Sequence, residues 1–194
     1  MTDRGTTDML LGIAGPSCSG KTTIARLLAT SLGAPLLHLD RHWIIGCDKP
    51  LVAGHPTYER PDQYDADALR IETLEAMSRS SIVVVEGFLL FGYPWFAENC
   101  TYRFLLDVPH HRLAVRRAAR HGLSLDDVVG GREPEADAGW NAHGREEWER
   151  FGKPQRRLPG MNVILRREDG GEWPDACEDI ARIMSNTTRK ALAA

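Results

Sequence analysis

Residues Gly15–Thr22 have the sequence Gly-Pro-Ser-Cys-Ser-Gly-Lys-Thr, which fits the pattern G-x-x-x-x-G-K-[ST]. The glycines of such a loop let backbone N–H groups approach phosphate closely, and the N-terminus of the next helix also faces the anion. The lysine adds positive charge toward the β and γ phosphates, and the threonine hydroxyl is a ligand for Mg²⁺. We therefore expect ATP and Mg²⁺ to bind here. The loop residues expected to bind ATP are Gly15, Ser17, Cys18, Ser19, Gly20, Lys21, Thr22 and Thr23.

Two carboxylates stand at the ends of apolar runs that follow this loop in the chain. Asp40 ends the run Leu36–Leu39, and Glu86 closes the run Ile82–Val85. Because the carboxyl ends of parallel strands face the ligand site of an α/β sheet, both side chains are expected beside the phosphate loop. Asp40 is suited to accept a proton from an attacking hydroxyl group, and Glu86 to orient a magnesium-bound water or the substrate. The expected catalytic residues are Lys21, Asp40 and Glu86, and the expected metal ligands are Thr22, Asp40 and Glu86.

Arginines are concentrated in one short segment near the middle of the chain. Between residues 112 and 120 there are four arginines and no acidic residue. Arg116 and Arg120 are one helical turn apart, so they share a face and are both expected to contact ATP phosphates, whereas Arg117 points in a neighbouring direction. Such side chains neutralise charge that develops during phosphoryl transfer. The alternative interpretation is a basic face that only contacts solvent.

The elements that must position these residues follow a regular alternation. Five short apolar runs predict strands buried on both faces. They are Met9–Ala14, Pro35–Leu39, Ser81–Glu86, Tyr102–Val108 and Met161–Leu165, with predicted helices at Thr22–Leu32, Asp65–Ser78, His110–His121 and Trp173–Ser185. The alternation predicts a single-domain α/β protein of the P-loop NTPase class, with a five-stranded parallel sheet and helices on both faces.

Two segments interrupt this alternation. Residues 40–63 are polar and contain several glycines and prolines, and a connection of this length in a compact domain is usually functional or disordered. We interpret it as a loop on the substrate side. Residues 122–159 combine glycines with charged residues, which predicts a mobile lid, over about 116–159, that contains a short helix; a surface insertion without function is the alternative. The whole range 1–194 is expected to form one domain.

Composition excludes several classes of protein. The chain has 194 residues, 42% of them hydrophobic, and a net charge of -3, which argues against a general nucleic-acid binder. No apolar run is long enough to span a membrane, and the first residues lack the pattern of a signal peptide. The four cysteines form no C-x-x-C pair, so reduced thiols in a cytoplasmic protein are expected. The expected partner is a small-molecule substrate, with neither nucleic acid nor membrane.

At this level of detail the sequence resembles a known family, the uridine kinase-like P-loop kinases, and is most similar to the nicotinamide riboside kinases. The resemblance covers roughly residues 9–120. The segments that carry it are Gly15–Thr23, His38–Asp40, Gln63–Asp65, Val85–Tyr93 and Arg116–Arg120.

The resemblance implies that ATP phosphorylates the 5′-hydroxyl of a riboside. It also implies a substrate-binding role for five residues. Asp40 would be the catalytic carboxylate, Asp65 would hold the ribose hydroxyls, and Tyr64 would lie beside the base. Glu86 would lie near the metal and the attacking hydroxyl, and Arg117 would contact the substrate. One departure is the sequence Arg41-His42-Trp43 after Asp40, where nicotinamide riboside kinases usually have a second acid.

Other functions remain open alternatives. A P-loop switch or ATPase that acts through a partner would transfer phosphate to water, but the chain has no N-K-x-D sequence to bind guanine and no L-S-G-G-Q sequence of transporter ATPases. A nucleoside monophosphate kinase would need an arginine cluster for a second phosphate, and residues 40–63 contain only Arg41 and Arg60. A non-nucleoside alcohol is a further alternative acceptor.

Overall fold

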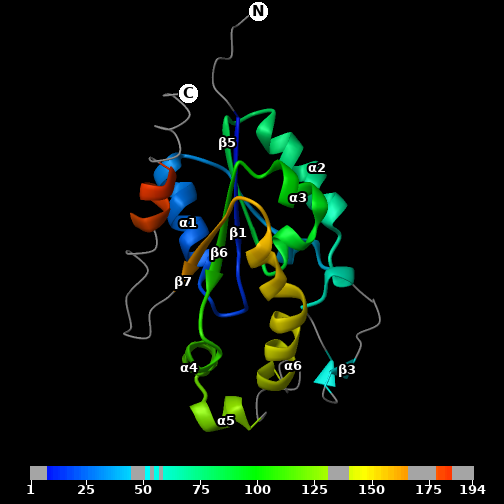
Figure 1. The fold of residues 1–194 in the computed structure, drawn as a ribbon, viewed down its shortest axis with the longest axis vertical. Helices are drawn as coiled ribbons and strands as arrows, with labels where there is room; N and C mark the ends of the chain where they lie inside the picture. The colour runs from blue at the N-terminus through cyan, green and yellow to red at the C-terminus, as the bar shows by residue number, and fades with distance from the viewer. Residues whose placement is uncertain are drawn as a thin grey trace, which may run out of the picture.

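A five-stranded parallel sheet forms the centre of the molecule (Figure 1). The computed structural model describes residues 8–44, 51–52, 55–56, 59–130, 140–165 and 178–184. Its strands have the spatial order β2-β5-β1-β6-β7. Their bounds are Met9–Ala14 for β1, Leu36–His38 for β2, Ile82–Gly87 for β5, Tyr102–Asp107 for β6 and Met161–Leu165 for β7. The predicted single-domain α/β fold is confirmed.

The central strands are buried on both faces, which explains why their sequences do not alternate between apolar and polar residues. In β1, Leu10, Leu11 and Ile13 have no exposed surface, and neither has the run Val83–Val85 in β5. The register pairs Met9 with Ile82 and Ala14 with Gly87. The two strands therefore end together, and the loop after β1 starts beside the end of β5.

Helices cover both faces of the sheet. On one face, α1 (Lys21–Leu32) and a helix at residues 178–184 pack through Ile24, Leu28 and Ile180. On the other face, α2 (Ala66–Met77), η3 (Leu90–Gly92) and α3 (Pro94–Asn99) contribute Leu69 and Phe96 to a second core cluster. Figure 1 shows α1 and α2 on opposite sides of the strands. The described residues include the later part of the helix expected at 173–185.

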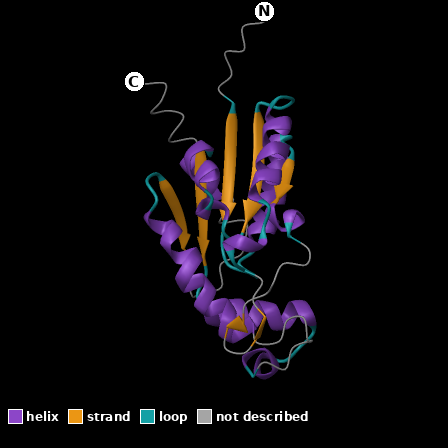
Figure 2. Ribbon diagram, turned by 90° about the vertical axis from the view of Figure 1, so that its right-hand side faces the viewer, coloured by secondary structure: helices purple, strands orange, loops and turns teal. Residues whose placement is uncertain are grey.

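A third group of helices lies beyond the carboxyl ends of the strands. Figure 2 shows the strand arrows of the sheet pointing toward this group. It contains α4 (His110–His121), α5 (Leu125–Val129) and α6 (Trp140–Glu147), which share a small core of their own around Leu113, Val128 and Trp140. The chain returns to β7 through η4 (Trp148–Gly152) and η5 (Lys153–Arg157). This is the range in which a lid is predicted, and residues 131–139 of it lie outside the described residues.

Short elements make up the described part of the predicted substrate-side loop. They are η1 (Leu39–His42), the antiparallel pair β3 (Leu51–Val52) and β4 (His55–Pro56), and η2 (Pro61–Gln63). An isolated bridge between Trp43 and Tyr64 joins the two ends of this segment. None of the helices in the described residues has the length and apolar character that crossing a membrane requires.

Candidate active site

The loop between β1 and α1 makes a tight turn at its centre. Cys18 and Gly20 have positive φ angles of 62° and 91°. The Ser19 N–H donates to the Pro16 carbonyl at 3.0 Å, which closes the turn. A Cβ atom at Gly15 would lie 2.8 Å from Ser19 Oγ, so the loop requires glycine there. This conformation leaves the amides at the start of α1 available to an anion.

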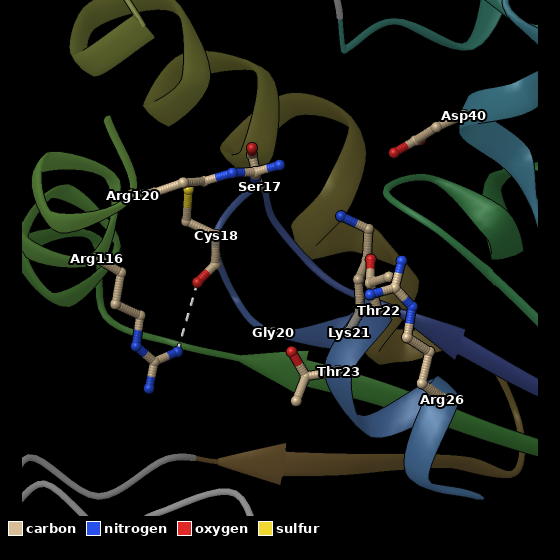
Figure 3. A pocket seen from close by; sticks show the side chains of 10 residues that line it. All are labelled: Ser17, Cys18, Gly20, Lys21, Thr22, Thr23, Arg26, Asp40, Arg116 and Arg120. Atoms are coloured by element: carbon tan, nitrogen blue, oxygen red, sulfur yellow. Dashed lines mark hydrogen bonds between the residues drawn. The ribbon is translucent and has the colours of Figure 1, made fainter. Parts of the chain in front are cut away.

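A pocket of about 420 Å³ opens at this loop (Figure 3). It is lined by Ser17, Cys18, Gly20, Lys21, Thr22, Thr23, Arg26, Asp40, Arg116 and Arg120. Eight of the ten belong to the expected ATP-binding residues, and Asp40 is the expected proton acceptor. The structure thus brings the loop, the carboxylate after β2 and two arginines of α4 to one site.

Lys21 is buried at the first position of α1 and is the lysine among the four basic residues that line this pocket. Burial lowers the pKa of the Lys21 amine, but the carboxylates of Asp40 and Glu86 outweigh that effect and leave the pKa raised. Figure 3 shows Lys21 and the Asp40 carboxylate pointing into the same space. The lysine therefore stays protonated, as binding to phosphate requires.

Glu86 is fully enclosed at the end of β5, with 2% of its surface exposed. The Thr22 hydroxyl donates to Glu86 Oε1 at 3.0 Å, and His38 Nδ1 lies 2.7 Å from the same oxygen. Burial raises the pKa of Glu86, whereas the hydrogen bond from His38 and the charge of Lys21 lower it, and the balance holds the pKa below its ordinary value. Glu86 is therefore ionised, and both partners act on one of its oxygens.

The arginines of α4 take different positions. Arg116 donates to the backbone carbonyl of Ser19 at 3.0 Å and to that of Cys18 at 3.5 Å. Arg120 is exposed and lines the pocket (Figure 3). Arg117 is buried, with 4% of its surface exposed, and lies outside the lining of this pocket. Arg116, which also lines the pocket, therefore joins α4 to the phosphate loop through two backbone carbonyls of the loop.

The sequence model of the AAA domain family matches residues 11–127, more than half of the chain. The chain belongs to this family. The match runs from within β1 through the phosphate loop, Asp40 and Glu86 into α5, so it covers the residues that line the pocket. No curated protein matches the chain.

This AAA domain protein is similar in fold to solved structures of small-molecule kinases. A gluconokinase from Sinorhizobium meliloti superposes with a TM-score of 0.59 at 17% identity, over 96% of this chain and 99% of that one. A shikimate kinase from Acinetobacter baumannii, in complex with shikimate, has a TM-score of 0.56 at 18% identity, over 94% and 96%. The AAA domain protein therefore has the fold of small-molecule P-loop kinases. The more specific resemblance to nicotinamide riboside kinases stays a prediction.

In this AAA domain protein a tryptophan of α6 fixes the buried arginine of α4. The Arg117 guanidinium lies 4.8 Å from the centre of the Trp140 ring, and the His110 ring stacks on the same ring at 5.1 Å. His110 and Arg117 are two turns apart on α4, which separates them by about 10 Å along the helix. The two distances fit a Trp140 ring inserted between them. Asn141 Oδ1 lies 2.9 Å from His110 Nε2 and accepts a hydrogen bond from it.

Of the five residues expected to bind substrate, only Asp40 lines the described pocket; Glu86 and Arg117, described above, and Tyr64 and Asp65 lie outside its lining. Asp65 is exposed, and its Oδ1 accepts a hydrogen bond from the Ala68 N–H at 2.8 Å, so it caps the N-terminus of α2. Tyr64 packs against the core, and burial raises the pKa of its hydroxyl, with the charge of Asp40 adding to the effect. Their roles in substrate binding stay predictions.

Two residues near the site were not expected from the sequence. Arg26 lines the pocket one helical turn after Thr22, so helical periodicity was the signal that could have found it. Glu59 is partly buried, and burial raises the pKa of its carboxyl to about 8, with Lys21 opposing this and Glu147 adding to it. No local pattern singles out Glu59, because its surroundings are built from distant parts of the chain.

Proposed function

We propose that this protein transfers the γ-phosphoryl group of ATP to a hydroxyl group of a small molecule, with a nucleoside or riboside as the first candidate acceptor. One observation carries the proposal. Asp40 lines the phosphate-loop pocket, and Figure 3 shows it on the side away from Arg116 and Arg120. A carboxylate on one side of a phosphate site and two arginines on the other suit an acceptor on the first side and a phosphate donor toward the second.

In the proposed reaction each of these groups has one role. Asp40 accepts the proton of the acceptor hydroxyl, whose oxygen forms a bond to the γ-phosphorus. The bond from that phosphorus to the bridging oxygen breaks, and ADP leaves with the electron pair. Lys21 and the arginines that line the pocket stabilise the negative charge on the phosphates during the transfer. Closure of the α4–α6 region over the pocket would exclude water, which would otherwise compete as the acceptor.

The residues around the pocket fit Mg²⁺ as the cofactor. Among the described residues no group of three His, Cys, Asp or Glu side chains could hold a metal ion by itself. Mg²⁺ needs no such group, because it is usually bound by one or two protein oxygens together with phosphates and water. The Thr22 hydroxyl and Glu86 supply such oxygens, and buried Glu86 Oε2 makes no hydrogen bond within the described part of the chain. When bound, Mg²⁺ would neutralise charge on the β and γ phosphates.

A second candidate acceptor is an alcohol that is not a nucleoside. It is favoured by the position of Asp65, whose carboxylate caps α2 and lies outside the pocket lining. If the acceptor were a riboside, the Asp65 carboxylate would be expected to hold the ribose hydroxyls. The fold is also shared with a gluconokinase and a shikimate kinase, whose names refer to non-nucleoside acceptors.

The test measures ADP production by the wild type with a panel of alcohols that includes nicotinamide riboside, uridine, sugar acids and simple polyols. Phosphorylated product is identified by mass spectrometry. Asp40→Asn should lower acceptor-dependent turnover by about 10²-fold or more, because it removes the proton acceptor. The same variant should still bind a non-hydrolysable ATP analogue.

Asp67→Asn is the matched control. Asp67 is an exposed residue of α2 that pairs with Arg70, so its loss should leave turnover unchanged. ATP hydrolysis that no alcohol accelerates and that Asp40→Asn leaves intact would contradict the kinase and support a switch or ATPase.

A further inference from the structure

The ends of β2 and β5 meet beside the phosphate loop, and one residue there has no role in the proposed reaction. His38 is the direct neighbour of Glu86 in the parallel register of these strands. Paired residues of adjacent strands project from the same face of a sheet, so the imidazole lies against the carboxylate. The distance from His38 Nδ1 to Glu86 Oε1 is 2.7 Å.

The two oxygens of Glu86 have different surroundings. Oε1 accepts hydrogen bonds from both His38 and Thr22, whereas Oε2 is buried and makes no hydrogen bond to any described residue. Glu86 does not line the pocket itself and is joined to it through Thr22, which does. A buried carboxylate oxygen without a partner is unfavourable, so such an atom directly behind a ligand site indicates a partner that arrives with the ligand. A hard cation or one of its waters has the matching chemistry.

We propose that His38 is a positioning residue for magnesium-dependent nucleotide binding, because its Nδ1–H holds Glu86 by Oε1 and leaves Oε2 available to the cation or its water. The inference rests on the proposed function, since the magnesium ion accompanies the nucleotide. His38 contacts neither the nucleotide nor the acceptor in this scheme. It acts through Glu86, as the hydrogen-bonding partners of metal ligands commonly do.

The contact between His38 and Glu86 also affects the segment that holds Asp40, on the acceptor side of the pocket. His38 is the last residue of β2 and directly precedes η1, which carries Asp40. Leu39 packs so closely on Gly87 that a Cβ atom there would lie 2.5 Å from Leu39 Cβ. Residues 38–39 are therefore joined to residues 86–87 by a hydrogen bond and by packing. His38 thus links the carboxylate on the metal side to the segment that holds the carboxylate on the acceptor side.

The test compares variants that differ in the donor at this position. His38→Leu removes the N–H, and His38→Asn keeps an N–H close to the position of Nδ1. The measurement is the apparent Kd for Mg²⁺ in the presence of a saturating non-hydrolysable ATP analogue. Binding is monitored by thermal shift, and a parallel series contains EDTA. In His38→Leu this Kd should rise by about tenfold or more, the usual effect of losing a partner of a metal ligand. In His38→Asn it should stay close to the wild-type value.

His42→Leu is the matched control. His42 lies four residues further along, in η1, and pairs with Glu72 at 2.8 Å, on the surface of α2. Its loss should leave the magnesium Kd unchanged. The stabilisation by the analogue in EDTA should be the same in all variants, because it depends on the loop backbone and Lys21. His38→Phe keeps a ring without the donor and replaces His38→Leu if that variant does not fold.

Three results would overturn the inference. If the wild type shows no magnesium-dependent stabilisation with the analogue, the proposed function fails and the inference fails with it. If the wild type responds and the donor-free variants respond equally, the inference alone fails. If His38→Asn loses as much magnesium affinity as His38→Leu, the imidazole does not act through its N–H donor and the inference again fails alone.

Discussion

Leu39 packs on the backbone of Gly87, at the point where β2 and β5 end together. The contact leaves no room for a side chain, since a Cβ atom at Gly87 would lie 2.5 Å from Leu39 Cβ and 2.8 Å from Leu39 Cδ2. Leu39 is fully buried, and the next residue is Asp40. The position of the proposed proton acceptor therefore depends on a glycine 47 residues away in the sequence.

Gly87→Ala should consequently impair the protein in two ways. Leu39 must move, which should lower the free energy of unfolding by about 1–3 kcal/mol, the usual cost of overpacking a core. The shift carries Asp40 with it, so turnover should fall in the variant even at temperatures where it is fully folded. Urea unfolding and acceptor-dependent ADP production measure the two effects. Gly92→Ala is the control, because the nearest atom to its Cβ would be 3.9 Å away; equal effects at both glycines would contradict this account.

Arg116 should support nucleotide binding through the phosphate loop. It donates to the carbonyls of Ser19 and Cys18, so Arg116→Ala removes charged hydrogen bonds that hold the loop. The Kd for a non-hydrolysable ATP analogue should rise by about tenfold, which corresponds to the loss of one charge-assisted hydrogen bond. Isothermal titration calorimetry measures it.

Arg112→Ala is the control for that measurement, because Arg112 belongs to the same helix and lies outside the pocket lining. It should leave the Kd within about twofold, as expected for a screened surface charge. Equal losses in both variants would instead indicate a general basic face on α4.

The titration of Glu59 should make stability depend on pH. Burial raises the pKa of this carboxyl from its ordinary value near 4.5 to about 8 in the folded protein. Between these two values the folded state holds a proton that the unfolded chain has released, so stability falls as the pH rises through this window. Glu59→Gln cannot ionise and lacks this dependence.

The Tm of Glu59→Gln relative to the wild type should therefore increase from pH 5 to pH 8.5, as measured by circular dichroism. Comparing the two proteins at each pH removes the contribution of all other titrating groups that they share. A Tm difference that stays constant over this range would show that Glu59 titrates near its ordinary value.

Trp140 should be important for the stability of the α4–α6 region. It is 4% exposed, stacks on His110 and lies over Arg117. Trp140→Ala should lower the free energy of unfolding by about 3–5 kcal/mol, the usual cost of removing a buried tryptophan. Trp43→Ala removes a tryptophan that is 37% exposed and should cost much less. Denaturant unfolding compares the two, and a similar loss at both positions would contradict the role assigned to Trp140.

Much of the fold could be predicted from the sequence. The expected bounds of the strands at Met9–Ala14 and Met161–Leu165 and of the helix at His110–His121 are those of the structure. These elements were recognisable because burial on both faces and helical periodicity leave patterns within a short stretch of chain. The strand expected at Pro35–Leu39 is shorter, because residues 39–42 turn into η1. In that turn Leu39 is buried against Gly87, a contact that local sequence does not reveal.

The sequence by itself determined the phosphate loop, because its chemistry depends on backbone shape and on side chains within eight consecutive residues. Tertiary structure alone decided which distant groups meet there. His38 and Glu86 are 48 residues apart and become neighbours only through the register of β2 and β5. The resemblance implied that Asp65 holds the ribose hydroxyls, and only the folded chain shows its carboxylate accepting the hydrogen bond of a helix cap. Such pairings depend on which surfaces pack together, and that is a property of the whole chain.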